Sequence, residues 1–175
     1  MGFFDFLTGS KPEQQPTTRP VDAVRQPVAA PADKIDLNRP EYQNGCDRVG
    51  DGVLHLMRAR EAVSGGDTDY ARLCYLKAAE SWKQANETEG GKWSIELEQA
   101  NKEYAAFVQT DPVYRNGLAA LLPTIKGNPG ILQTDLYKAF PDIERETVSY
   151  ILYFAASSGK IERTKKGRSY ELRAK

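Results

Sequence analysis

Apolar side chains recur every three or four positions through residues 41–110, which is the spacing of one face of an α-helix. The pattern is interrupted at "SGGD" and "ETEGG", and it closes before Pro112, because proline disfavours helical backbone in the preceding residue. Three amphipathic helices joined by short loops have to bury their apolar faces against one another. Residues 41–110 are therefore predicted to form a three-helix, repeat-like bundle.

Residues 111–175 show a different order of patterns. A helical stretch and a short apolar strand precede two more helical stretches, and two strands then flank "KKGR", whose glycine suits a tight hairpin turn. Val148, Leu152 and Ala155 share one helical face and are expected in the core. The fold class predicted for the chain is mainly α, with a helical bundle followed by a small α+β domain.

This order of elements resembles a winged helix-turn-helix domain over residues 113–173. The residues that carry the resemblance are Ile143, the run "RETV", Leu152, and "SSGKI" around Gly159. The resemblance implies a recognition helix that enters the DNA major groove and a wing that contacts phosphates or the minor groove. In the helix, the candidate contacts are Arg145, Glu146, Thr147, Ser149, Tyr150 and Tyr153. In the wing, they are Arg163, Lys165, Lys166, Arg168 and Arg173.

The second and third helices of the bundle resemble a tetratricopeptide hairpin. The resemblance rests on "YLKAAESW" in one helix and on Ala100, Tyr104 and Pro112 in and after the next. Helical arrays normally need three or more such repeats for stability. Residues 41–110 are therefore treated as a repeat-like bundle and not as a solenoid.

Charge is unevenly distributed along a chain whose formal net charge is zero. Residues 41–110 hold eight basic and twelve acidic side chains, whereas residues 111–175 hold eleven basic and seven acidic ones. Seven of the basic side chains lie in residues 160–175. This asymmetry favours a polyanionic partner for the hairpin. A second interpretation is that the lysines only prevent edge-to-edge strand pairing.

The first 40 residues are predicted to lie outside the folded part. Residues 10–40 contain six of the ten prolines and are expected to form a disordered linker, so that the fold begins near Pro40. Residues 1–9 crowd apolar side chains onto a polar tail and are interpreted either as a partner-docking motif or as a terminus that packs loosely on its own domain. The docking candidates are Phe3, Phe4, Phe6 and Leu7.

No pattern in the sequence is typical of a catalytic, metal or cofactor site. His55 lacks Ser/Asp or Cys partners at useful spacing, and no phosphate-binding glycine loop is present. Cys46 and Cys74 lie in helical patterns without a Cys-x-x-Cys motif, which fits a reducing, cytoplasmic location. No apolar run approaches the roughly 20 residues of a membrane span. We expect a non-enzymatic protein without a metal or cofactor.

Two hypotheses remain. The first is a DNA-binding regulator of the bacterial or phage type, whose helical region forms a homo-oligomer or binds a protein partner. The second is an interaction adaptor, because Glu144 and Glu146 would repel phosphates and the aromatic side chains of Tyr150 and Tyr153 are typical of protein interfaces. The charge of the wing favours the first hypothesis, while the acidic and aromatic character of the helix favours the second.

Overall fold

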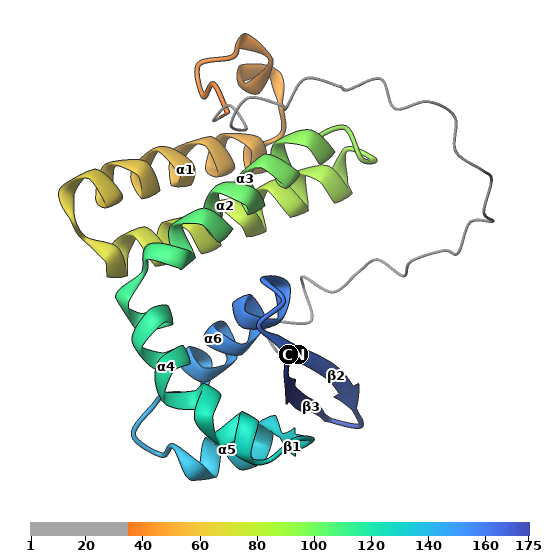
Figure 1. Cartoon of the computed structure of the whole chain (residues 1–175). Coiled ribbons are helices and arrows are strands. Elements are labelled where there is room, and N and C mark those ends of the chain that lie inside the picture. The colour runs from red at the N-terminus through yellow and green to blue at the C-terminus, as the bar shows by residue number, and fades with distance from the viewer. Residues whose placement is uncertain (1–34) are drawn as a thin grey trace, which may run out of the picture. The chain divides into compact units, whose positions relative to one another are not determined.

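The computed structural model describes residues 35–175, which belong to one compact unit. Six α-helices and a small three-stranded antiparallel sheet at the C-terminal end make up this part of the chain (Figure 1). It is therefore mainly helical, as predicted. The aromatic motif at residues 1–9 and residues 10–34 of the expected linker lie outside the described residues.

The helical region consists of a short 3-10 helix and three α-helices. Its elements are η2 (Pro40–Asn44), α1 (Asp47–Gly65), α2 (Thr68–Thr88) and α3 (Ser94–Thr110). Helix α2 packs against α1 and against α3, as Figure 1 shows for the upper part of the molecule. Its buried residues include Ala71, Cys74, Tyr75, Ala78 and Trp82, whereas Tyr70 and Leu73 are exposed.

The start of the fold differs from the prediction. Ile35 is only 4% exposed, and its carbonyl oxygen accepts a hydrogen bond from Nη1 of Arg60 at 3.1 Å, so the packed chain begins before Pro40. The first long helix begins at Asp47, because Gly45 is extended and separates it from η2. A Cβ atom at this glycine would lie 2.8 Å from Val49, a separation that requires the neighbouring atoms to move.

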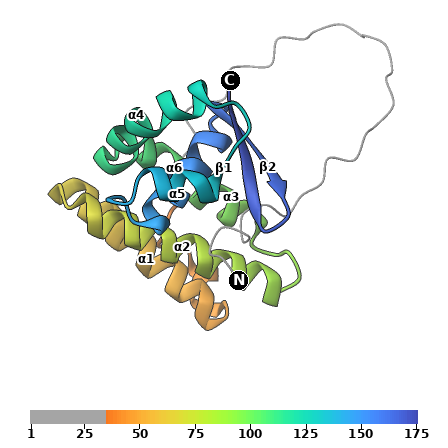
Figure 2. The same cartoon turned by 90° about the horizontal axis from the view of Figure 1, so that it is seen from below.

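The C-terminal region follows the predicted order of elements. It contains α4 (Pro112–Gly127), β1 (Ile131–Leu132), α5 (Gln133–Ala139), α6 (Arg145–Ser157), β2 (Ile161–Lys166) and β3 (Ser169–Ala174). The strand order is β1-β3-β2, and both strand pairs are antiparallel. Figure 2 shows β1, α5 and α6 close together with the hairpin beside them.

The core of the C-terminal region is built around one side of α6. Val148, Ile151, Leu152 and Ala155 are all fully buried there, which confirms the predicted apolar face. Helix α4 approaches this side closely at Gly117, where a Cβ atom would stand 2.2 Å from Cδ1 of Ile151. The other elements contribute the buried side chains of Leu121, Ile125, Leu136, Ile161 and Leu172.

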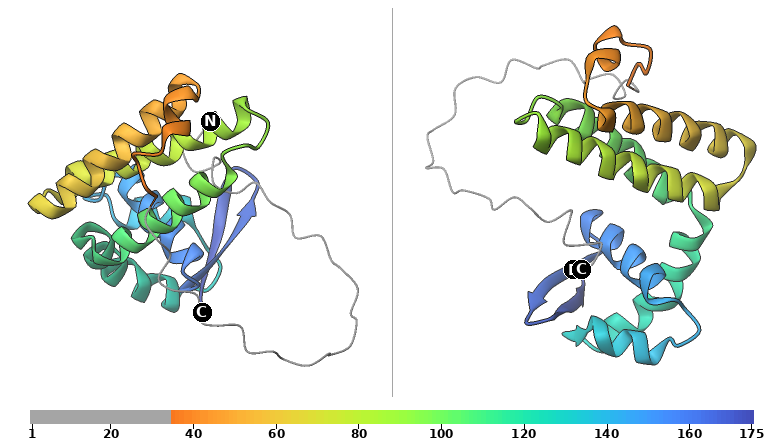
Figure 3. Two further views of the ribbon diagram at one scale, coloured as in Figure 1. Left: turned by 90° about the horizontal axis from the view of Figure 1, so that it is seen from above. Right: turned by 180° about the vertical axis from the view of Figure 1, so that it is seen from behind.

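The boundary expected between residues 110 and 111 falls where α3 passes into α4, with only Asp111 between the two helices. The view from behind in Figure 3 shows α4 leading away from the helical region toward α5 and α6. The two regions nevertheless contact one another, since the rings of Tyr104 on α3 and Phe154 on α6 lie 4.9 Å apart, edge to face. None of the helices in residues 35–175 has the length and hydropathy needed to cross a membrane.

Replacing Leu152 with alanine is expected to destabilise the fold by about 2–4 kcal/mol, because a fully buried leucine leaves a cavity. The half-buried Tyr153 beside it serves as the control, and Tyr153→Ala should cost markedly less. Urea unfolding of both variants measures the difference. Equal losses of stability would contradict the assignment of the core side of α6.

Candidate nucleic-acid interface

Helix α6 has three distinct sides, and only part of it is accessible. The first side forms the core described above. The second carries Tyr150 and Phe154 and faces the helical region. The third lies toward α5 and the hairpin and carries Arg145 and Ser149. Each side offers different chemistry, so the predicted contact residues of the helix have to be placed one by one.

The side toward the helical region is occupied by contacts within the chain. Tyr150 is 6% exposed, and its hydroxyl group donates a hydrogen bond of 2.7 Å to Oδ2 of Asp111. Its ring lies 5.3 Å from that of Phe154, which in turn meets Tyr104 of α3. The expectation that Tyr150 is exposed for base contact is therefore wrong, because the tyrosine belongs to the packing between the two regions.

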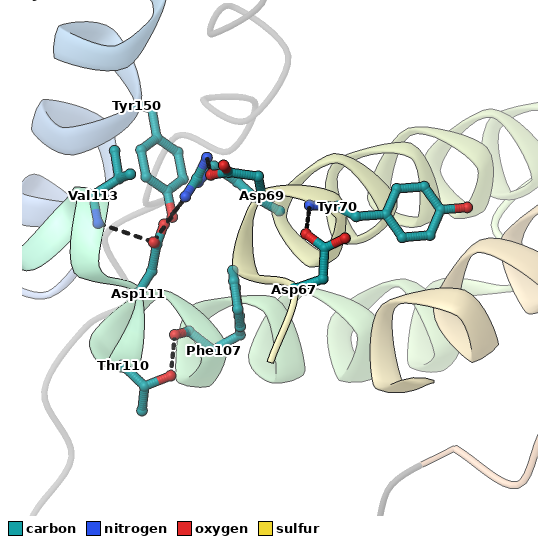
Figure 4. Close-up of polar contacts among 9 residues, drawn as sticks. Asp67, Asp69, Tyr70, Phe107, Thr110, Asp111, Val113 and Tyr150 are labelled. Atoms are coloured by element: carbon teal, nitrogen blue, oxygen red, sulfur yellow. Dashed lines mark hydrogen bonds and ion pairs between the residues drawn. The ribbon is translucent and has the colours of Figure 1, made fainter. Parts of the chain in front are cut away.

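Asp111 is the polar centre of this packing (Figure 4). Its carboxylate is fully buried and accepts hydrogen bonds from Nε of Arg72 at 2.7 Å and from Nη2 of the same side chain at 2.9 Å. It also accepts the backbone N–H of Val113 at 3.0 Å and thereby caps α4. With the hydrogen bond from Tyr150, one carboxylate connects α2, the start of α4 and α6.

The surroundings of Asp111 determine its ionisation. Burial acts to raise the pKa of this carboxyl group, but the hydrogen bonds from Arg72, Tyr150 and Val113 outweigh that effect and hold the pKa below its ordinary value of 3.8. Burial and the hydrogen bond to Asp111 raise the pKa of Tyr150, so its hydroxyl group stays protonated and remains a donor. The carboxylate is therefore charged at neutral pH.

The side of α6 toward the hairpin belongs to a partly exposed surface of basic and aromatic side chains. The guanidinium of Arg163 on β2 stacks 3.5 Å from the ring centroid of Tyr170 on β3. Lys165 is the direct cross-strand partner of Tyr170, so it lies on the same face of the hairpin. Arg145, in the first turn of α6, lies 5.7 Å from the ring centroid of Tyr137 on α5. We call these five residues the basic–aromatic surface.

A polar network connects the two halves of the basic–aromatic surface. Nε of Arg163 donates a hydrogen bond of 3.1 Å to Oε1 of Gln133. Nε2 of Gln133 donates to Oγ of Ser149 at 3.1 Å and also to the hydroxyl group of Tyr137. The hydroxyl oxygens of Tyr137 and Ser149 are 2.7 Å apart. Ser149 is buried in this network, so the expectation that it is exposed for DNA contact is wrong.

Among the basic residues predicted for the wing, some form ion pairs within the hairpin and others do not. Glu171 forms ion pairs of 2.7 Å with both Lys166 and Arg173, and hydrogen bonds from these two residues lower the pKa of its carboxyl group. Lys165 and Arg168 are exposed and make no hydrogen bond or ion pair within residues 35–175. Lys166 and Arg173 are therefore less available to a polyanion than Lys165 and Arg168.

On α6, the predicted contact residues are exposed mainly near its start. Arg145 and Glu146 are exposed, whereas Thr147 and Tyr153 are half-buried. Burial raises the pKa of Tyr153. The N-terminal turn of α6 is therefore the part of the helix most open to a ligand, and it carries one basic and one acidic side chain.

Three residues of this surface were not among the sequence candidates: Gln133, Tyr137 and Tyr170. Tyr170 could have been found from the sequence, because side chains alternate between the two faces of a strand. In a hairpin with a two-residue turn, this alternation places Tyr170 on the same face as Arg163 and Lys165. Gln133 and Tyr137 carry no such signal, since their role depends on how α5 meets α6. In residues 35–175, no three His, Cys, Asp or Glu side chains gather in a way that could hold a metal ion.

Comparison of the chain with models of protein families, with curated proteins and with solved structures finds no match.

Replacing Tyr150 with phenylalanine is expected to destabilise the protein by about 1.5–3 kcal/mol, because it removes a hydrogen bond to a charged and buried group. The control is Tyr70→Phe on the exposed face of α2, which should have little effect. Urea unfolding followed by circular dichroism measures both. Stability unchanged in Tyr150→Phe would show that the hydrogen bond to Asp111 does not hold α6 in place.

Acid should weaken the same interaction. Because the pKa of Asp111 is lowered by folding, its ionisation stabilises the protein above its unfolded pKa, and this stabilisation is lost as pH falls through the lower folded value. The difference in unfolding free energy between wild type and Asp111→Asn should therefore be large at neutral pH and should shrink below pH 3.8. A difference that is independent of pH would contradict a charged Asp111.

Proposed function

We propose that this chain is a non-enzymatic nucleic-acid-binding regulator whose residues 112–174 are arranged as a winged helix. The order α4, β1, α5, α6, β2, β3 supports this arrangement, as does the sheet order, in which β3 lies between β1 and β2. In such an arrangement α6 corresponds to the recognition helix and the β2–β3 hairpin to the wing. The ligand is proposed to be DNA.

The observation that carries the proposal is the basic–aromatic surface. Arg145 and Arg163 stack near the rings of Tyr137 and Tyr170, and Lys165 is the cross-strand partner of Tyr170. Gln133 holds the hydroxyl group of Tyr137 and the guanidinium of Arg163 by hydrogen bonds. Cations bind phosphates and release condensed counterions, while aromatic rings and guanidinium planes offer stacking surfaces to bases. Nucleic acid is the polyanion that matches both kinds of side chain.

The same surface points to binding with little sequence readout. Ser149 and Tyr150, which were expected to read bases, are buried in contacts within the chain. Arg145 is then the main candidate for a contact with a base edge, and Glu146 next to it opposes close approach of a phosphate. Phosphate contacts position a protein on DNA but carry no sequence information. The proposed binding is therefore dominated by the DNA backbone.

A protein-interaction adaptor is the second candidate, and the exposed apolar side chains of the helical region favour it. Leu54 and Met57 are 42% and 43% exposed on the same side of α1. Exposed large apolar residues that gather on one face mark protein interaction sites. By contrast, the aromatic side of α6 gives the adaptor less support than the sequence indicated, because Tyr150 and Phe154 are used within the chain.

A salt titration of DNA binding tests the primary proposal. Replacing Lys165 and Arg168 with alanine should reduce the slope of log affinity against log salt by about 2, because each exposed cation neutralises one phosphate. Adding Lys166→Ala should change the slope by less than about one further unit, since Glu171 already pairs with this lysine. Fluorescence anisotropy with a labelled duplex measures each slope.

The control replaces two exposed cations of the helical region, Arg48 and Lys102, with alanine and should leave the slope unchanged. A wild-type protein that does not bind the duplex even at low salt would end the nucleic-acid proposal. Binding that is lost equally in the control would mean that attraction depends on net charge and not on the hairpin.

A further inference from the structure

The outer side of α1 carries two large apolar side chains that stay partly exposed within residues 35–175. Leu54 and Met57 are 42% and 43% exposed. Together with Gly50 and Val53 they line one side of a groove of about 570 Å³, and its other side is lined by Leu37, Asn38, Arg39, Tyr42 and Gln43. We call this the α1 face. An uncovered apolar groove along a helix suits the insertion of another helix.

The position of α1 in the helical region explains why its outer side is uncovered. Helix α2 lies between α1 and α3, and α1 packs on α2 and on η2. Figure 1 shows α1 as the outermost of the three long helices. Each helix of a layered helical array buries its apolar side against a neighbour, and the terminal helix needs a polar outer side or a partner. The outer side of α1 presents Leu54 and Met57 between charged residues such as Asp51, Arg58 and Glu61.

The charged residues beside the α1 face would complement the same residues of a second copy of the chain. Asp51 and Arg58 are seven residues apart, which places them on the same flank of the helix, one on each side of Leu54 along the axis. Arg58 is exposed and makes no hydrogen bond or ion pair within residues 35–175, and Asp51 pairs only with Arg48 across one turn. A two-fold axis perpendicular to α1, halfway between Asp51 and Arg58, would place each of these two positions opposite the other one in a second copy.

We propose that the α1 face binds a second copy of this chain, with the two α1 helices antiparallel about a two-fold axis near Leu54. This symmetry places Asp51 opposite Arg58 of the second copy, and Arg58 opposite its Asp51. It also brings Met57 of the second copy near Gly50, where a side chain would meet no atom within 4 Å. The interface is isologous, which is the commonest way in which identical chains form dimers.

A parallel pairing or an unrelated helix fits this face less well. In a parallel pair the two-fold axis runs along the helices, so the flanks that carry Asp51 and Arg58 lie on opposite edges of the interface and their charges gain no partner. An unrelated partner would have to reproduce both the apolar contact and the order of charges that α1 already carries. The dimer does not depend on the nucleic-acid proposal, because no residue of the hairpin takes part.

Sedimentation equilibrium of the full chain tests the dimer. Wild type should show twice the mass of one chain, and Leu54→Glu should reduce the mass by half, because two carboxylates would be buried at the two-fold axis. Leu73→Glu is the matched control, since Leu73 on α2 is 45% exposed and lies outside the α1 face. This variant should remain dimeric.

Charge exchange tests the antiparallel geometry without altering the apolar contact. Arg58→Glu alone and Asp51→Arg alone should each weaken the dimer, because like charges then face each other twice. Asp51→Arg and Arg58→Asp combined in one chain should form a dimer with itself, since every facing pair is again of opposite charge, but should not pair with wild type, since like charges would then face each other. Circular dichroism confirms that each variant is folded.

Three outcomes would overturn the proposal. The first is a wild-type protein that is a monomer at every concentration. The second is a Leu54→Glu variant that remains a dimer, and the third is a Leu73→Glu control that is a monomer. A dimer that is lost in Leu54→Glu, while the variant with both charges exchanged pairs with wild type as well as with itself, would exclude the antiparallel arrangement.

Discussion

The buried carboxylate of Asp111 is the constraint on which the arrangement of this protein depends. It sits between two helices and is bound by an arginine from α2, a tyrosine from α6 and a backbone N–H from α4. A charged group without solvent is stable only when it is paired and hydrogen-bonded. Removing one partner leaves the others unsatisfied, so the three helices are held as a set. Together with the contact between Tyr104 and Phe154, this network joins the helical and the C-terminal region within the compact unit that holds residues 35–175.

That constraint also determines which part of α6 a ligand can reach. Because Tyr150 is bound to Asp111 and Phe154 packs on Tyr104, one flank of the helix is closed by the chain itself. The opposite flank is held by Gln133 and Ser149 against α5 and the hairpin. What stays accessible is the first turn of α6 and the cations and rings of the hairpin. The proposal that the protein contacts mainly the phosphate backbone of DNA rests on this geometry. The α1 face lies on a different helix and is proposed to bind a different partner, a second copy of the chain.

The sequence predicted the elements better than the surfaces. Periodic apolar positions such as Val148 and Leu152 located the core side of α6, and the glycine of "KKGR" located the hairpin. The pairing of Arg72 with Asp111 could not be predicted, because the two residues are 39 positions apart and no local pattern links them. For the same reason Tyr150 looked like an exposed aromatic residue. Gly45 and Ile35 were missed because the start of the fold depends on contacts with Val49 and Arg60 and not on periodicity.

Native-state hydrogen exchange tests the central claim, that Asp111 joins the helical region and the C-terminal region into one cooperative unit. If it does, the slowest amides of α2 and of α6 should exchange with the same free energy of opening, because neither helix opens without the other. In Asp111→Asn the two sets should separate, with α6 exchanging faster than α2. Amides of α6 that already open more easily than those of α2 in the wild-type protein would contradict the account.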